Sequence, residues 1–159
     1  MNTAFLINFI NLSKEKKLEI LSWRNDQSIR IWMYDDSIIK EESHISFIDT
    51  LKEDKTKQYF LVSNSDKDLG VIYFTDISKD QVEFGIYSNP NTKKVGKILM
   101  ETICNYGFNT LKTKKLIAEV FENNIKAISL YNQFNFKQTN KLIRNNKTIL
   151  SLELENENR

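Results

Sequence analysis

The chain has 159 residues, of which 40 % are apolar and 28 % charged, and this composition is typical of a single globular domain. The net charge of +2, from 23 basic and 21 acidic residues, argues against nucleic acid as the main partner, because binding a phosphate backbone usually needs a clear basic excess. No apolar run approaches the ~20 residues of a membrane-spanning helix, and no signal peptide is recognisable, so we expect a cytoplasmic protein with no membrane partner.

The first part of the chain predicts one strand followed by helices. Residues Phe5 to Ile10 are short, apolar and partly alternating, which indicates an opening strand. Ser13 can cap a helix that runs to about Asn25, and a shorter helical piece follows from Ser28 to Met33. A further helix is predicted from Glu41 to Lys52, where apolar residues recur at helical spacing.

The pattern then changes to short strands separated by polar turns. Three of them, at residues 58–63, 69–75 and 81–87, predict an antiparallel meander. The remaining predicted elements are a helix at 96–111, a strand at 116–121, a helix at 124–134, and strands at 136–143 and 149–154 joined by a tight turn at Asn145-Asn146. This order predicts an α/β fold with a mixed sheet and helices on both faces, in a single domain over residues 1–155 with a frayed tail at 156–159.

The single cysteine, Cys104, excludes an internal disulfide. It lies in an apolar stretch that is predicted to be helical, so we expect a buried packing residue. A catalytic thiol would need a nearby base, and the only histidine of the chain is His44.

The segment from Val120 to Phe136 carries the most specific motif of the chain. A strand ends there, an Asn pair opens a helix, and Ala127 and Leu130-Tyr131 follow on successive turns. This segment resembles the second signature block of the GCN5-related N-acetyltransferase (GNAT) superfamily, V-x-x-x-N-x-x-A-x-x-L-Y-x-x-x-G-F. Every position matches except the glycine, which is Asn135 here, and asparagine is the next residue most tolerant of positive φ.

The resemblance implies the GNAT fold, with a mixed, roughly seven-stranded sheet whose central strands splay, and acetyl-CoA as cosubstrate with no metal. It further implies that Asn124 bonds the pantetheine arm and that Tyr131 lies beside the thioester sulfur. Structural readings stay open for both residues, because Asn124 is also a good helix cap and Tyr131 could be a core aromatic.

The first signature block of the family, Q/R-x-x-G-x-G/A, is degenerate here. Asn91 and Lys94 replace two of its residues, and only the second glycine, Gly96, survives. The exposed amides of a helix start would still favour a pyrophosphate, and neighbouring lysines add positive charge there, although a plain solvated lysine cluster is the alternative. Gly85, inside a strand, indicates a bulge or a close backbone approach, beside which the strand edge would pair with pantetheine. The predicted cofactor residues are Ile86, Tyr87, Ser88, Lys93, Lys94, Val95, Gly96, Lys97, Asn124 and Tyr131.

Motifs in the first half resemble one branch of the family, which acetylates the UDP-linked 4-amino-4,6-dideoxysugar of pseudaminic acid biosynthesis, a route to flagellin glycosylation. They include Trp23-Arg24-Asn25, Ile31-Trp32-Met33-Tyr34 and His44-x-x-Phe47. The resemblance implies that Arg24 and His44 hold the nucleotide. It implies apolar sugar contacts from Met33, Tyr34, Phe47 and Tyr87. Core packing for Met33 and Phe47, a structural role for His44, and carbonyl bonding by Arg24 remain the alternatives.

The expected reaction is direct attack of a neutral amine on the thioester carbon. An amino-sugar nitrogen should have a pKa of ~8, so a water chain that ends on a carboxylate can accept its proton. Glu119 is the preferred carboxylate because the same branch carries a glutamate on that strand, with Glu83 as the second candidate and Tyr73 as a member of the chain. Tyr131 is the expected acid for the leaving thiolate, or a hydrogen-bond donor to it.

Two other functions remain open at this stage. A ribosomal-protein or N-terminal peptide acetyltransferase would keep the fold and cofactor but would need an open, acidic acceptor cleft. A non-catalytic acyl-CoA-binding regulator would keep Asn124 and the lysine loop but would not need Tyr131. The sequence also leaves the oligomeric state open, with a homodimer among the alternatives.

Overall fold

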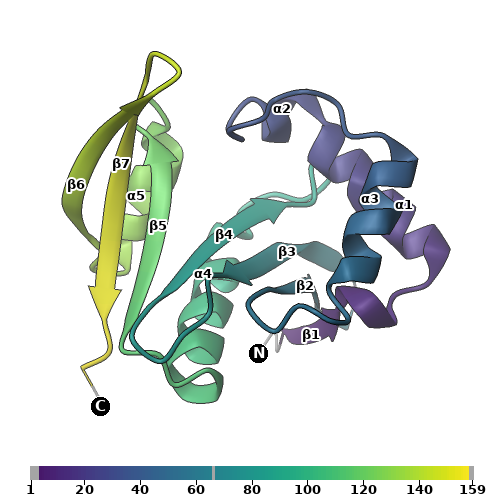
Figure 1. The fold of residues 1–159 in the computed structure, drawn as a ribbon, viewed down its shortest axis with the longest axis horizontal. Helices are drawn as coiled ribbons and strands as arrows, with labels where there is room; N and C mark the ends of the chain where they lie inside the picture. The colour runs from purple at the N-terminus through teal and green to yellow at the C-terminus, as the bar shows by residue number, and fades with distance from the viewer. Residues whose placement is uncertain (1–3, 66, 158–159) are drawn as a thin grey trace.

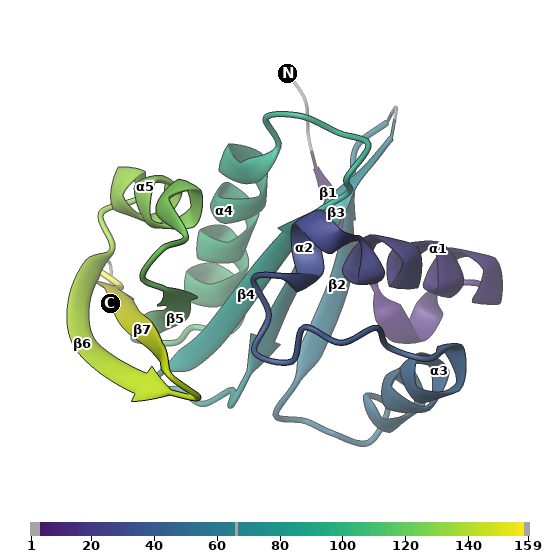
Figure 2. The ribbon, with the colours of Figure 1, turned by 90° about the horizontal axis from the view of Figure 1, so that it is seen from above.

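The computed structural model describes residues 4–65 and 67–157, which form a seven-stranded mixed sheet with helices on both faces (Figures 1 and 2). The strand order across the sheet is β1-β2-β3-β4-β5-β7-β6. The strands are β1 (Phe5–Asn8), β2 (Gln58–Ser63), β3 (Asp68–Thr75), β4 (Val82–Ser88), β5 (Lys115–Phe121), β6 (Lys137–Arg144) and β7 (Lys147–Glu155). The helices are α1 (Lys14–Asn25), α2 (Gln27–Arg30), α3 (Glu41–Thr50), α4 (Gly96–Asn105) and α5 (Ile125–Gln133). The predicted α/β class and mixed sheet are confirmed.

The two faces of the sheet carry separate hydrophobic cores. Strand residues alternate between the faces, so β2 sends Phe60 and Val62 to one core and Leu61 to the other. The first core is closed by α4 and α5, through residues such as Met100 and Tyr131. The second is closed by α1 and α3, and these two helices lie together on the opposite side of the sheet (Figure 2). The helices on both faces leave the far end of the sheet, at β6, largely exposed.

The central strands separate soon after they begin. β4 and β5 run parallel, and their ladder holds only the pairs Val82↔Leu116 and Glu83↔Ile117. Beyond these pairs the strands diverge as a V (Figure 1). The opposite edge of β4 stays paired with β3 as far as Ser88. The predicted splay is therefore present, and it exposes the inner edge of β4 from residue 84 to residue 88.

Gly85 lies on β4 where this separation begins, and its cross-strand partner is Tyr73 of β3. A Cβ atom on Gly85 would overlap the ring and the hydroxyl of Tyr73. Glycine is therefore required so that the tyrosine ring can lie across the β4 backbone, which is the close approach that the sequence predicted.

Several turns adopt left-handed backbone conformations at the expected residues. Asn135, in the place of the family glycine, has φ 69° where α5 ends. Asn145 and Asn146 have φ 50° and 64° in the turn between β6 and β7. Lys94, which replaces the other family glycine, has φ 60°. The side chains differ from the family pattern, but the backbone adopts the conformation that a glycine would permit.

Some element boundaries differ from the predictions. The opening strand ends at Asn8, because the Asn8 side chain accepts a hydrogen bond from the Ile10 amide and starts a 3₁₀ turn (Phe9–Asn11). The helical piece predicted to reach Met33 ends at Arg30. The helix from Gly96 changes to a π-helical turn (Tyr106–Thr110) in its last part. Residues 158–159 of the predicted tail lie outside the described residues.

None of the helices in the described ranges 4–65 and 67–157 is both long enough and apolar enough to cross a membrane.

We expect Gly85→Ala to destabilise the protein by about 1–3 kcal/mol, because the new methyl group must displace a buried tyrosine ring. Urea denaturation measures this loss. The matched control is the same substitution in a Tyr73→Ala background, where the obstruction has been removed and the added cost of Gly85→Ala should nearly vanish. An equal cost in both backgrounds would show that the Tyr73 ring is not the reason why residue 85 must be glycine.

Candidate functional site

The opening between β4 and β5 brings together predicted site residues from both faces of the sheet. Tyr131 approaches from α5 on the first face, and Tyr73 lies across Gly85 on the second. The phenol of Tyr73 is close enough to contribute to the raised pKa of Tyr131. Tyr73 lies over Gly85 and Tyr131 packs on Phe84, the neighbouring residue of β4, so the two phenols approach the same part of the opening although they are 58 positions apart in the chain.

Tyr131 is 5 % exposed and lies edge-on to Phe84 of β4, with ring centroids 5.7 Å apart. Phe136 packs against the same ring at 5.8 Å. Burial raises the pKa of Tyr131 well above its usual value, so its hydroxyl stays protonated at any physiological pH. Such a group acts as a hydrogen-bond donor. The core-packing alternative is also true of its ring, which belongs to the first hydrophobic core.

Tyr73 is the centre of a row of tyrosines on the second face. Its ring stacks on Tyr59 at a centroid distance of 4.8 Å, and Tyr87 follows at 6.4 Å. Burial raises the pKa of all three phenols, so none of them ionises near neutral pH. The row holds the Tyr73 ring in place beside the opening.

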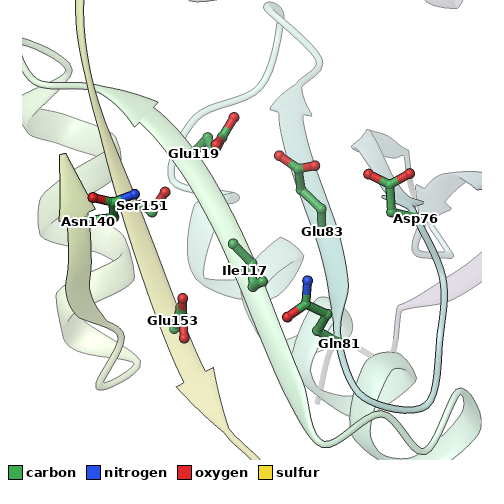
Figure 3. Close-up of a pocket in the computed structure, with 8 residues that line it drawn as sticks. All are labelled: Asp76, Gln81, Glu83, Ile117, Glu119, Asn140, Ser151 and Glu153. Carbon is green, nitrogen blue, oxygen red and sulfur yellow. The ribbon is translucent and has the colours of Figure 1, made fainter. Parts of the chain in front are cut away.

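Glu83 and Glu119 face each other from the two separating strands (Figure 3). They line an open depression of about 310 Å³, whose other acidic residues are Asp76 and Glu153. Partial burial raises the pKa of Glu83, and the negative charges of Glu119 and Asp76 raise it further. The depression is therefore a negatively charged site, and this environment favours the protonated form of Glu83.

Glu119 is held by two side chains from distant parts of the sequence. Its Oε1 accepts a hydrogen bond from the Tyr34 hydroxyl at 2.6 Å and lies 3.4 Å from Nη1 of Arg144. The Arg144 guanidinium also lies over the Tyr34 ring, 5.7 Å from its centroid. These contacts join the segment after α2 to the β6–β7 hairpin across the mouth of the opening. They fix the orientation of the Glu119 carboxylate.

The predicted pyrophosphate end lies at the start of α4. Val95 precedes the helix without a side-chain cap, so the first amides of α4 have no partner from a capping side chain. Lys93, Lys94 and Lys97 are exposed around these amides. A Cβ on Gly96 would lie 3.1 Å from Leu130, so this glycine permits the close packing of α4 and α5. Uncapped amides beside free ammonium groups suit an anionic phosphate.

Asn124 and the edge of β4 are the remaining predicted cofactor contacts. Asn124 caps α5, with its Oδ1 accepting a hydrogen bond from the Ala127 amide at 3.2 Å. The cap occupies the oxygen, so the side-chain nitrogen is the atom that can donate to a pantetheine carbonyl. Ile86, Tyr87 and Ser88 lie on the diverging part of β4, where its edge turns away from β5. The residues present therefore fit an acyl-CoA along the opening.

The residues predicted for nucleotide binding are placed differently. The His44 ring is 6 % exposed, and its Nε2 bonds the Lys17 carbonyl at 2.9 Å, which ties α3 to α1. Arg24 donates from Nη2 to the Asp35 carbonyl at 3.0 Å, and its Nη1 is buried without a hydrogen-bond partner. Both arrangements match the structural alternatives, and the nucleotide role of these two residues stays an untested prediction.

Of the residues predicted to contact the sugar, Met33 and Phe47 pack against the second core as partly buried side chains. Phe47 lies edge-on to Tyr59, with centroids 5.0 Å apart. Tyr34 is 52 % exposed and reaches the opening through Glu119. Tyr87 is buried behind Tyr73. Tyr34 is therefore the member of this set that contacts the carboxylates directly.

Sequence reasoning missed Arg144 and Tyr59. Arg144 is brought to Glu119 by the pairing of β6 with β7 and of β7 with β5, and no local motif marks it. Tyr59 is the cross-strand partner of Tyr73, a relation that depends on the register of β2 and β3. Cys104 packs against the first core, and burial raises the pKa of its thiol to about 11, in line with the predicted packing role. Within residues 4–65 and 67–157 no group of three or more His, Cys, Asp or Glu side chains is arranged to hold a metal ion.

Comparison with known proteins identifies relatives over most of the chain. The model of the acetyltransferase (GNAT) domain family matches residues 8–137. The acetyltransferase PseH of Campylobacter jejuni is 42 % identical over 131 residues, which cover 82 % of this chain and 83 % of that protein. The PseH of a second C. jejuni strain is 41 % identical over the same coverage.

Solved structures give the same result. The crystal structure of C. jejuni N-acetyltransferase PseH in complex with acetyl coenzyme A superimposes with a TM-score of 0.80 at 34 % identity, covering 96 % of this chain and 99 % of that one. Spermidine N-acetyltransferase of Vibrio cholerae, in complex with CoA and spermine, has a TM-score of 0.86 over 96 % of this chain and 95 % of that one. Its identity is only 17 %, so it supports the fold alone.

We expect Glu83→Gln to stabilise the protein at neutral pH, because the native state raises the pKa of Glu83 above its unfolded value of ~4.3. In a pH range above that value the native state holds the proton more tightly than the unfolded state, so the stability of the wild-type protein falls as pH rises through the native pKa. Glu83→Gln has no carboxyl proton to lose, so this fall in stability should be absent from the variant. Its advantage in melting temperature should be largest at pH 7 and should disappear below pH ~4.

The matched control is Glu101→Gln, which removes an exposed carboxylate from α4. An advantage of Glu83→Gln that does not change with pH, or a loss of stability at pH 7, would contradict the prediction.

Proposed function

The chain belongs to the GNAT acetyltransferase family, and we propose that it transfers the acetyl group of acetyl-CoA to the 4-amino group of a UDP-linked amino-deoxysugar in pseudaminic acid biosynthesis. That it is an acetyl-CoA-dependent N-acetyltransferase follows from the family, from the PseH relatives and from the PseH complex with acetyl coenzyme A. The acceptor is our proposal. The observation that carries it is 42 % identity with PseH over 82 % of the chain, far above the 17 % shared with the polyamine enzyme.

The acidic depression is suited to the amine of such an acceptor. An ammonium group that enters it meets Glu83 and Glu119, which face each other across the opening. The amine must lose a proton before it attacks, and with a pKa of ~8 the loss costs only ~1.4 kcal/mol at pH 7. Acetyl-CoA supplies the thioester that the neutral amine then attacks. A moderate base is sufficient for this step.

Glu83 is the better candidate for that base. A carboxylate whose pKa is raised is well matched to accepting a proton near neutral pH. The Glu119 carboxylate is engaged by Tyr34 and Arg144, which fix its orientation. We therefore assign proton acceptance, directly or through water, to Glu83, and the electrostatic support of the amine to Glu119. This reverses the order that the sequence favoured for the two residues.

Tyr131 acts on the leaving thiol from the other face. Its raised pKa makes complete proton transfer to a thiolate of pKa ~8.5 less favourable than it would be for an ordinary phenol. A hydrogen bond to the sulfur, strengthening as negative charge develops, does not need that transfer. After attack the nitrogen carries one further proton, which it loses to water on the opposite face, and the released CoA thiolate takes up one proton from solvent while the Tyr131 hydroxyl hydrogen-bonds to the sulfur.

A peptide acceptor remains the competing function, because an acidic depression also suits a cationic peptide. The acid residues are concentrated at one end of the opening, and an arginine, Arg144, stands at their edge. This mixed charge fits an acceptor with one amine and one anionic group better than a purely cationic chain. We also propose that the enzyme acts in the cytoplasm, where acetyl-CoA and nucleotide sugars are both available.

The direct test is to incubate the protein with acetyl-CoA and either a UDP-4-amino-4,6-dideoxysugar or a set of peptides that includes ribosomal-protein N-termini. Mass spectrometry of the acceptors and release of free thiol are the two measurements. We expect acetylation of the nucleotide sugar with a kcat/KM at least about 10²-fold above any peptide, since the discrimination rests on several binding groups. Preferred acetylation of a peptide would refute the acceptor, and failure to release thiol with any amine would favour a non-catalytic role.

Tyr131→Phe removes only the hydroxyl that we place beside the sulfur. The expected result is a fall in kcat of roughly 10²-fold, as for loss of one catalytic donor, with little change in the affinity for CoA. Stopped-flow kinetics of thiol release and calorimetric titration with CoA separate the two effects. Tyr106→Phe, which removes a phenol bonded to Gln58 away from the opening, is the matched control. An unchanged kcat in Tyr131→Phe would end this assignment.

A further inference from the structure

A second cavity lies at the end of β5, beyond the carboxylates of the opening. Its volume is about 470 Å³, within the range of roughly 300–1,000 Å³ that small-molecule sites occupy. Three parts of the chain form it: the segment after α2, the end of β5 and the tip of the β6–β7 hairpin. The residues that matter below are Ile31, Trp32, Phe121, Asn123, Asn146 and Lys147.

This cavity adjoins the acidic depression. Phe121 follows Glu119 by two residues on β5, so the two side chains lie on the same face about 7 Å apart along the strand. Tyr34 connects them, because its hydroxyl bonds Glu119 and its ring lies edge-on to Phe121 with centroids 5.7 Å apart. A ligand whose amine meets Glu119 can therefore extend past Tyr34 into the second cavity.

The lining of the second cavity has a different chemical character from the depression. Trp32 is 38 % exposed and Ile31 42 %, so a flat apolar surface faces solvent there. The ammonium of Lys147 lies over the Phe121 ring, 4.9 Å from its centroid. Its cross-strand partner in the hairpin is Arg144, which places two cations side by side at the mouth. The carboxylate in the lining, Glu122, is paired with Lys141 at 2.9 Å.

We propose that this second cavity binds the uridine diphosphate end of the acceptor. The base stacks on Trp32, the amides of Asn123 and Asn146 are available to its polar edge, and the diphosphate meets Lys147 and Arg144. The proposal rests on the proposed function, and it deepens it by naming the residues that select a nucleotide.

The charge layout gives the acceptor a single orientation. In a 4-amino sugar linked to UDP through C1, the amine and the diphosphate stand at opposite ends of the sugar ring. Tyr34 links the acidic depression to the cationic mouth, because its hydroxyl bonds Glu119 while its ring contacts Phe121, over which the Lys147 ammonium lies. A reversed acceptor would bring its phosphates against Glu83 and Glu119, and like charges in a partly desolvated site repel strongly. Arg144 lies at the boundary, where it can serve both Glu119 and a phosphate.

The cavity also accounts for the position of Arg24 and His44. Nη2 of Arg24 and Nε2 of His44 are engaged with the backbone carbonyls of Asp35 and Lys17. Nucleotide recognition is thereby assigned to the segment after α2 and to the hairpin, while Arg24 and His44 support the helices that present Trp32.

A fluorescence titration tests binding directly with UDP as the probe. The chain has two tryptophans, and Trp23 is 3 % exposed whereas Trp32 is 38 % exposed, so the signal that responds to a surface ligand comes from Trp32. We expect UDP to quench the wild-type fluorescence and expect the quenching to be lost in Trp32→Phe. UDP should still bind when CoA is present. Competition between UDP and CoA would mean that the cavity belongs to the cofactor, and would overturn the proposal.

Steady-state kinetics with the UDP-amino-sugar supply the second test. Trp32→Ala should raise the KM for the sugar nucleotide roughly 5-fold or more, by the loss of one base stack. Lys147→Ala should raise it about 2- to 5-fold, with a smaller effect at high salt. The KM for acetyl-CoA should stay unchanged in both, and this also shows that the variants fold. Ile38→Ala and Lys137→Ala, which alter exposed residues on the same loop and hairpin, are the matched controls and should behave as wild type.

The outcomes separate this inference from the function on which it rests. If wild-type protein acetylates the sugar nucleotide and both variants keep its KM, the cavity assignment is wrong while the function stands. If UDP binds and Trp32→Ala weakens it, but no UDP-amino-sugar is acetylated, the cavity assignment stands and the acceptor is a different nucleotide conjugate. If wild-type protein neither binds UDP nor acetylates the sugar, both are overturned.

Discussion

The early separation of β4 and β5 is the constraint on which the site depends. Two strands that pair only at Val82↔Leu116 and Glu83↔Ile117 leave backbone donors and acceptors along the inner edge of β4. Backbone polar groups inside a protein need hydrogen-bond partners, and an extended amide-containing arm such as pantetheine can provide them as an added strand would. The cofactor fit and the access of the acceptor both follow from this one departure from regular pairing.

The separation also divides the chemistry between two faces. Tyr131 is supported from the first core, where burial keeps its phenol protonated and ready to donate. The carboxylates lie on the second face, beyond Tyr73, and there partial exposure leaves them able to exchange protons. The proposed donor for the leaving thiol and the proposed acceptor for the amine proton thus lie on different faces of the sheet, with Gly85 and Tyr73 between them.

The contacts around the two carboxylates are explained better by function than by a gain in protein stability. Glu83 has its pKa raised by burial and by neighbouring negative charges, so its ionised form costs free energy in the native state. Arg144 offsets part of that cost by pairing with Glu119, and it also ties the hairpin to Tyr34. Such a carboxylate is expected where a moderately basic group is needed at neutral pH. The charged groups that set its electrostatic environment come from separate segments of the chain.

The sequence by itself determined most of the fold, the family and the cosubstrate. Apolar periodicity placed the strands and helices to within a few residues, because burial requires it in each element. The segment from Asn124 to Phe136 identified the family, and Asn135 took the left-handed conformation that the family glycine has. These features are local, and a local pattern can be read from neighbouring residues alone.

Only the tertiary structure decided the acceptor side. The preference between Glu83 and Glu119 depends on which one meets Tyr34 and Arg144, and these partners come from residues 85 and 25 positions away along the chain. The burial of His44 depends in the same way on how distant segments pack. So does the presence of Trp32 and Lys147 in the lining of one cavity. Charge, burial and pairing of this kind are set by contacts across the sheet, and no spacing within the sequence encodes them.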